Sequence, residues 1–224
     1  MTAGTSIQVA PLAVLFDLDN TLTASLAFAA GTLVEAAAAH GQHLDFSEVA
    51  SYGGALYIPL LQQLLGINEV TAREIYATYV ERFGSTMAGR LEASAGANEI
   101  VSAMAARGIR LGLVTNKMES LAGDILALFG WRSAFGVIVG QDTRPFQKPH
   151  PEPALFALAT LECDPAQAAF IGDATADIQC GRDAGIPILI GLLGTESAEE
   201  LQAAGATHIC ENLAEASELL LGSS

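Results

Sequence analysis

Basic residues are scarce in this chain of 224 residues, which contains 10 lysines and arginines against 25 aspartates and glutamates. The resulting formal net charge of −15 repels nucleic-acid phosphates and anionic lipid head groups. We therefore expect neither a nucleic acid nor a membrane surface as a partner. Basic residues are also absent ahead of Asp17, so the sequence lacks the positively charged region with which a secretory signal begins.

Cysteine is rare as well, and no stretch is well suited to crossing a membrane. Cys163, Cys180 and Cys210 are widely spaced and form neither a metal-binding pair nor an even disulfide set, which favours a reducing compartment. The longest uncharged run, residues 49–68, contains two adjacent glycines and a proline, which make it a poor membrane span. We expect a cytoplasmic protein that is a monomer or a small homo-oligomer.

Hydrophobic residues, in contrast, make up 51% of the chain, which is ample for a core. Short apolar runs without alternation predict strands covered on both faces, at 11–16, 109–114, 135–139, 168–171, 186–190 and 207–210. Helical patterns, several of which end at a glycine, alternate with them at 99–107, 118–129, 153–161, 174–184, 198–204 and 213–221. This alternation predicts an α/β fold with a Rossmann-like, doubly wound parallel sheet.

One long segment breaks the alternation. Between residues 16 and 109 we find no buried strand, and the patterns are helical at 25–40, 46–51, 55–65 and 70–83. A crossover between parallel strands needs only about a dozen residues. We therefore predict a core domain formed by residues 1–23 and 93–224, with an α-helical domain inserted at residues 24–92.

Polar residues follow the predicted strands, where ligands bind in open parallel sheets. They combine carboxylates with a hydroxyl, an amide and an ammonium group: Asp17, Asp19, Thr115, Asn116, Lys148, Asp173 and Asp177. Clustered carboxylates repel one another and need a cation, and hard oxygen ligands suit Mg²⁺. A hydroxyl donor and an ammonium group beside that cation form a site for a phosphate. Strand-end aspartates also cap helices or start turns, but that role does not explain all of them at one sheet edge.

The chain has only two lysines, Lys117 and Lys148, and both lie in these loops rather than scattered over a surface. A proline-rich segment follows Lys148 and would fix the direction from which it approaches the site. Lys117 stands at the predicted start of a helix, where we expect it to face the solvent.

Four blocks in a fixed order make the chain similar to a known family: Asp17-Leu-Asp-Asn-Thr-Leu22, Val114-Thr-Asn116, Lys148-Pro149 and Gly172-Asp-Ala-Thr-Ala-Asp177. Over almost its whole length it resembles the haloacid dehalogenase-like (HAD) hydrolases, in particular their phosphatases with a helical cap domain. Within the family, Val114-Thr-Asn-Lys117 and Lys148-Pro-His-Pro151 look most like the corresponding segments of phosphoglycolate phosphatases. Asn20 stands where the family often has glycine, but asparagine tolerates unusual backbone angles.

The resemblance implies a role for each acidic residue at the predicted site. It makes Asp17 the nucleophile and Asp19 the general acid and base. The implied Mg²⁺ ligands are the carboxylates of Asp17 and Asp173 and the backbone carbonyl of Asp19, with Asp177 supporting the metal site.

Substrate-binding residues are implied in both domains. Thr115 and Lys148 would hold the phosphoryl oxygens, and backbone N–H groups near Asn116 would add donors. In the inserted domain, Tyr52-Gly53-Gly54 falls where caps of this family carry a specificity loop. For this segment, substrate contact and a plain turn between helices remain alternatives.

The sequence thus predicts a Mg²⁺-dependent phosphomonoester hydrolase that acts on a small phosphorylated metabolite through an aspartyl-phosphate intermediate. The preferred candidate substrate is 2-phosphoglycolate. The alternatives are a sugar-phosphate or nucleotide phosphatase, a phosphomutase, or a non-catalytic phosphate-binding module. Phosphonatases and β-phosphoglucomutases of this family use a cap lysine, and residues 24–92 contain none. A phospho-accepting receiver domain would lack the long insertion.

Overall fold

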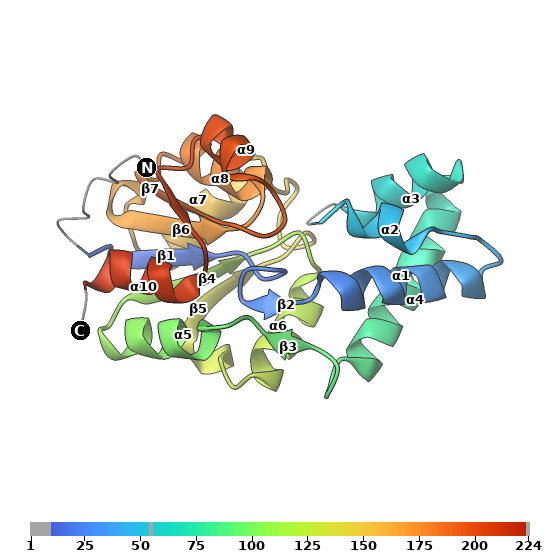
Figure 1. Ribbon diagram of the computed structural model, residues 1–224, viewed down its shortest axis with the longest axis horizontal. Coiled ribbons are helices and arrows are strands. Elements are labelled where there is room, and N and C mark those ends of the chain that lie inside the picture. The colour runs from blue at the N-terminus through green and yellow to red at the C-terminus, as the bar shows by residue number, and fades with distance from the viewer. Residues whose placement is uncertain (1–9, 54–55, 223–224) are drawn as a thin grey trace. The chain divides into compact units, whose positions relative to one another are not determined.

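The computed structural model of the protein describes residues 10–53 and 56–222 (Figure 1). The chain divides into two compact units, one made of Met1–Thr23 with Ala93–Ser224 and the other of Ala24–Glu92. All the strand-end residues singled out in the sequence belong to the first unit, whereas Tyr52 and Gly53 belong to the second.

The first unit is built on a sheet that has six strands in the described residues. In chain order they are β1 (Ala13–Phe16), β4 (Arg110–Val114), β5 (Phe135–Val139), β6 (Ala168–Gly172), β7 (Ile188–Leu192) and β8 (His208–Cys210). In space the order is β5-β4-β1-β6-β7-β8, and all neighbouring strands are parallel. Strand β1 is buried throughout and lies between β4 and β6, where the order of strands reverses. Ligands of such sheets bind beyond the carboxyl ends of the strands at this switch point.

Helices cover both faces of the sheet. In Figure 1, α5 (Ala97–Ala106), α6 (Glu119–Leu128) and α10 (Leu213–Leu221) lie on one face, and α7 (Glu152–Thr160), α8 (Thr175–Asp183) and α9 (Ala198–Ala204) on the other. Short 3₁₀ turns precede two strands, η1 (Arg132–Ala134) and η2 (Pro165–Gln167). The prediction of a doubly wound α/β fold is confirmed.

The second unit is helical, with α1 (Leu26–Ala39), α2 (Phe46–Ala50), α3 (Tyr57–Leu65) and α4 (Glu69–Thr86). Helix α4 packs against both α1 and α3. The ring of Tyr57 lies edge-on to that of Tyr79 with centroids 5.0 Å apart, and Tyr79 also contacts Phe83. These rings give the unit an aromatic core of its own.

Several details differ from the sequence-based expectation. Strands β2 (Thr23–Ala24) and β3 (Glu92–Ala93) pair in a small separate sheet that was not predicted, since two-residue strands have no periodicity. Strand β7 begins at Ile188 rather than at residue 186, because Pro187 has no N–H to give to a sheet. Helix α4 continues to Thr86, three residues beyond its predicted end.

In the part of the chain that the structure describes, no helix combines the length and the apolar character that crossing a membrane requires.

Candidate active site

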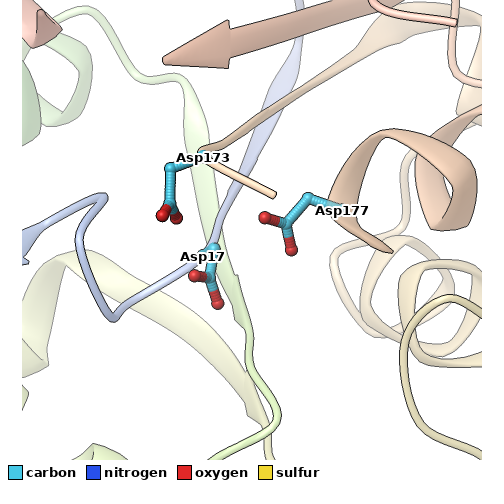
Figure 2. A group of neighbouring side chains, drawn as sticks. All are labelled: Asp17, Asp173 and Asp177. Carbon is cyan, nitrogen blue, oxygen red and sulfur yellow. The ribbon is translucent and has the colours of Figure 1, made fainter. Parts of the chain in front are cut away.

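Three aspartates from the central strands meet at the carboxyl edge of the sheet. Asp17 directly follows β1, and its N–H donates to the Ile171 carbonyl of β6 at 2.9 Å. Asp173 directly follows β6, and Asp177 lies in the first turn of α8. All three are buried, and Figure 2 shows their carboxylates gathered together. One oxygen from each lies within 4.8 Å of those from the other two.

Lys148 brings a positive charge to two of these carboxylates. Its Nζ donates to Asp17 Oδ1 and to Asp177 Oδ1, each at 2.6 Å. The lysine is buried like its partners, so solvent screens these ion pairs little. The Lys148–Asp17 pair joins residues that are 131 positions apart in the chain. Asp173 is held by other partners.

The cluster shifts the pKa values of its members. Burial raises the pKa of Asp17 well above its ordinary value; Lys148 lowers it again, and the neighbouring carboxylates add to the rise. Burial, reinforced by Asp177, likewise raises the pKa of Asp173 to about 7. Burial works against the charged form of Lys148, but its two carboxylate partners outweigh this and raise the pKa of the lysine. The three carboxylates therefore bring together more negative charge than the single ammonium group of Lys148 offsets.

The start of α8 fixes Asp177 in place. Its Oδ2 accepts the N–H of Ala174 at 3.1 Å, as a carboxylate in the first helical turn often does. The same side chain lies against Gly172, where a Cβ atom would collide with the carboxylate. A glycine at this position therefore allows the close approach of Asp177 to the end of β6.

Hydroxyl groups from two loops hold Asp173. Thr21 Oγ1 donates to Asp173 Oδ1 at 3.0 Å, and Thr195 Oγ1, from the loop after β7, donates to Asp173 Oδ2. Asn20 Nδ2 in turn donates to Thr195 Oγ1 at 3.2 Å. Asn20 has a φ of 58°, so it adopts the left-handed backbone in the position where glycine is common.

Strand β4 ends in a tight arrangement of Thr115, Asn116 and Lys117. The Thr115 N–H donates to the Val139 carbonyl at 2.9 Å, and its buried hydroxyl accepts the N–H of Lys117 at 3.2 Å. The Asn116 side chain donates to the backbone carbonyl of Lys148 at 3.4 Å. These contacts tie the loop after β4 to the loop that carries Lys148.

Lys117 does not face the solvent, so that expectation is wrong. Only 6% of the residue is exposed, and its Nζ lies 3.2 Å from Asp19 Oδ2. A pattern at a helix start cannot reveal this, because the partner Asp19 lies in the loop after a different strand. The signal in the sequence was that both lysines of the chain lie in strand-end loops.

The donor set fits a hard divalent cation. Three buried carboxylates offer oxygen ligands to a common point, and oxygen-only sites suit Mg²⁺. Burial and, after it, mutual repulsion raise the pKa values of Asp17 and Asp173, and a divalent cation would offset both effects. The carboxylate of Asp19 is not a member of this group, and its backbone carbonyl remains the predicted ligand atom.

The sequence of residues 14–190 matches the family model of the haloacid dehalogenase-like hydrolases. This chain belongs to that family. It is 31% identical over 194 residues to the phosphoglycolate phosphatase of Xylella fastidiosa strain 9a5c, a match that covers 85% of this chain and 84% of the relative. It is 32% identical over 176 residues to the N-acetylmuramic acid 6-phosphate phosphatase of Pseudomonas aeruginosa, which covers 77% and 78% of the two chains.

Solved structures share the fold of this haloacid dehalogenase-like hydrolase. A crystal structure from Haemophilus somnus 129PT, titled a predicted phosphoglycolate phosphatase, superimposes with a TM-score of 0.82 at 23% identity. The match covers 94% of this chain and 98% of the other. This likeness shows the shared fold, while the family model and the curated relatives confirm the family membership inferred from the four sequence blocks.

The structure gathers the predicted core residues of this hydrolase at one sheet edge, but their roles stay predictions. Tyr52 and Gly53 follow α2 in the second unit and are half-buried there. Gly54 lies outside the described residues. Whether these residues contact substrate or form a plain turn therefore stays a prediction as well.

Proposed function

We propose that this hydrolase is a Mg²⁺-dependent phosphomonoesterase that acts on a small phosphorylated metabolite, with 2-phosphoglycolate as the preferred substrate. The observation that carries the proposal is the buried group of Asp17, Asp173 and Asp177, in which Lys148 bridges two carboxylates. Such a group combines a nucleophile, oxygen ligands for a hard cation and a positive charge for a phosphoryl group. The similarity to curated phosphatases supports this choice of reaction.

In the first half of the reaction, an oxygen of Asp17 attacks the phosphorus atom. The bond from phosphorus to the leaving oxygen breaks, and its electron pair goes to that oxygen. Asp19 supplies the proton that neutralises the departing alkoxide. The product alcohol leaves, and the phosphoryl group remains on Asp17 as an acyl phosphate.

In the second half, water attacks the phosphorus of this aspartyl phosphate. Asp19, now a carboxylate, takes a proton from the water, and the bond from phosphorus to the Asp17 oxygen breaks. Inorganic phosphate is released, and both aspartates return to their starting states. The same residue thus serves as acid in one step and base in the other.

The remaining groups bind and orient the phosphoryl group. We propose that Thr115 and Lys148 donate to its oxygens, together with backbone N–H groups near Asn116. Lys148 is already fixed between Asp17 and Asp177, so it can reach a phosphoryl group on Asp17 without a large movement.

The proposed ligands of Mg²⁺ are the carboxylates of Asp17 and Asp173 and the backbone carbonyl of Asp19. Asp177 belongs to the same group of carboxylates and also anchors Lys148. When bound, the cation offsets negative charge on the phosphoryl oxygens. We further propose that residues 24–92 are the cap domain and that Tyr52 and Gly53 belong to its specificity loop.

The test is phosphate release by the purified protein from 2-phosphoglycolate and a panel of sugar and nucleotide phosphates. We expect turnover that a chelator abolishes and Mg²⁺ restores. Asp17→Asn should abolish turnover, since the amide keeps the shape but cannot attack, and Asp19→Asn should lower it by about 10²–10⁴-fold. Turnover of Asp17→Asn near the wild-type rate, or full activity in excess chelator, would exclude the proposed chemistry.

A sugar 6-phosphate is the second candidate substrate. It is favoured by the match to the N-acetylmuramic acid 6-phosphate phosphatase, which is 32% identical to this chain, compared with 31% for the phosphoglycolate phosphatase of Xylella fastidiosa strain 9a5c. The ratio of kcat/KM for N-acetylmuramic acid 6-phosphate to that for 2-phosphoglycolate decides between the two.

A further inference from the structure

Lys117 is the second buried lysine at this sheet edge, and the chemistry above does not use it. Its Nζ lies 3.2 Å from Asp19 Oδ2, and the exposed fractions of the two side chains are 5% and 20%. Removing an ammonium group from water is costly, and pairing with a carboxylate offsets that cost. The chain thus places both of its lysines on carboxylates of the site, Lys148 on Asp17 and Asp177, and Lys117 on Asp19.

The backbone of Lys117 is held firmly on both sides. Its N–H donates to Thr115 Oγ1 at 3.2 Å, and its carbonyl accepts the N–H of Gln141 at 2.9 Å. The residue lies three positions after the end of β4, which pairs with β1, the strand that Asp17 follows. Its side chain therefore extends from a fixed point, which makes its ammonium group a suitable anchor for the carboxylate of Asp19.

We infer that Lys117 is a positioning residue, which holds Asp19 in the orientation that proton transfer requires. The inference rests on the proposed role of Asp19 as general acid and base. The last torsion of an aspartate side chain is broad, so an unrestrained carboxyl group samples many orientations. Contact at Oδ2 restrains that torsion and directs Oδ1 to the reacting oxygen.

The proton balance is compatible with this contact. When Asp19 is neutral, Oδ1 carries the proton and Oδ2 accepts from the ammonium group of Lys117, since a protonated carboxyl group keeps acceptor capacity. As the leaving oxygen departs with the electron pair of its bond to phosphorus, it takes the proton from Oδ1. Lys117 keeps its own protons throughout and forms no bond to the substrate.

A series of leaving groups separates positioning of Asp19 from a structural role. An alkoxide leaving group needs protonation, whereas 4-nitrophenolate is stable as an anion and needs it far less. The quantity kcat/KM covers only the steps up to formation of the aspartyl phosphate, so hydrolysis of that intermediate does not obscure the comparison. The measurement is kcat/KM for glycerol phosphate and for 4-nitrophenyl phosphate.

Lys117→Met should lower kcat/KM for the alkyl phosphate at least about 10-fold more than for the aryl phosphate, because small misplacements of a catalytic group cost up to about 10²-fold. Asp19→Asn should show the same preference more strongly. Lys117→Arg, which keeps a donor at this position, should restore part of the lost alkyl phosphatase activity. Arg107→Met is the matched control, because it removes the same charge from an exposed residue that precedes β4, at the end of the strand opposite to the site. It should leave the ratio of kcat/KM for the two esters unchanged.

Two results would overturn the inference. One is an equal loss on both substrates by Lys117→Met while Asp19→Asn discriminates between them. The other is a rise in KM alone, confined to substrates with a second anionic group, which would mean that Lys117 binds the substrate directly. If the wild type hydrolysed no phosphate ester, 2-phosphoglycolate included, or if Asp19→Asn did not discriminate, the proposed function itself would be wrong.

Discussion

Asp17 lies within reach of one ammonium group and three other carboxylates, so its charge depends on all of them. Burial alone would favour the neutral acid, which cannot attack phosphorus. Lys148 opposes this effect, and a bound divalent cation would oppose it further. Lys148 and a bound cation would therefore both favour the ionised form that the proposed nucleophile needs.

We predict that metal-free protein loses stability as the pH rises from about 4 to about 7. The pKa of Asp173 is raised to about 7 by burial and by Asp177, so across this range the folded state holds a proton that the unfolded chain has released. The stabilisation is complete below the unfolded pKa and is lost as the pH passes the folded pKa; the raised pKa of Asp17 acts in the same direction. The measurement is the unfolding midpoint in chelator.

The variant Asp173→Asn provides the control for this prediction. It removes the titrating group, so its unfolding midpoint should fall less steeply with pH than that of the wild type. Saturating Mg²⁺ should raise the wild-type midpoint more at neutral than at acidic pH, because the cation competes with protons for these carboxylates. Parallel pH curves for wild type and variant would show that Asp173 does not titrate in this range.

Thr195 is predicted to strengthen cation binding although it is not itself a ligand. Its hydroxyl donates to Asp173 Oδ2 and accepts from Asn20, so it orients the carboxylate that is the proposed ligand. Thr195→Val should weaken Mg²⁺ binding by about 10-fold, because groups that orient metal ligands typically contribute 10–100-fold in affinity. The measurement is titration calorimetry with Mg²⁺ in the absence of substrate.

Thr195→Ser keeps the hydroxyl and should bind Mg²⁺ almost as the wild type does. Thr160→Val serves as the matched control, since that hydroxyl donates only to the Phe156 carbonyl on an exposed face of α7. Unchanged Mg²⁺ affinity in Thr195→Val would mean that Thr21 alone suffices to orient Asp173.

Elements of the core could be predicted because their burial leaves a direct mark on composition. Strand β1 is covered on both faces and therefore shows an unbroken apolar run that stops at Asp17. Gly205 ends α9 with a φ of 117°, a conformation that glycine adopts without steric cost. Apolar runs and helix-ending glycines together predict alternating strands and helices, and hence a parallel sheet. The carboxyl ends of its strands share one edge, so the polar residues that follow the strands are predicted to lie together.

What could not be predicted depends on partners distant in the chain. Lys117 is buried and pairs with Asp19 from the loop after β1, and nothing in its own helix start indicates this. Thr195 escaped notice for a similar reason: its partner Asp173 lies 22 residues away, in a different loop. Local sequence patterns reflect the propensity and periodicity of single helices and strands. Contacts such as those of Lys117 and Thr195 arise only when the loops at the sheet edge pack together.

At the scale of the whole molecule, the net charge of −15 works against an anionic substrate. Long-range electrostatic steering cannot assist association, so attraction must be local. In the proposed reaction, Lys148 and a bound cation would provide it for the phosphoryl group. A second anionic group on the substrate would need a further partner, and the arginines of the second unit are already engaged there. Arg73 pairs with Glu69 at 2.6 Å, and Arg90 lies over the ring of Phe28.

We therefore predict that residues around Gly53, rather than the arginines of residues 24–92, determine substrate choice. Gly53→Val places a branched side chain in the segment between α2 and α3, and it should raise KM for metabolite substrates by about 10-fold or change their ranking. The effect on 4-nitrophenyl phosphate should be smaller, because that substrate offers the segment less to recognise. Arg73→Gln, at an exposed position, should leave the ranking unchanged. If Arg73→Gln reset the ranking while Gly53→Val did not, substrate recognition would belong to the α4 face that carries Arg73.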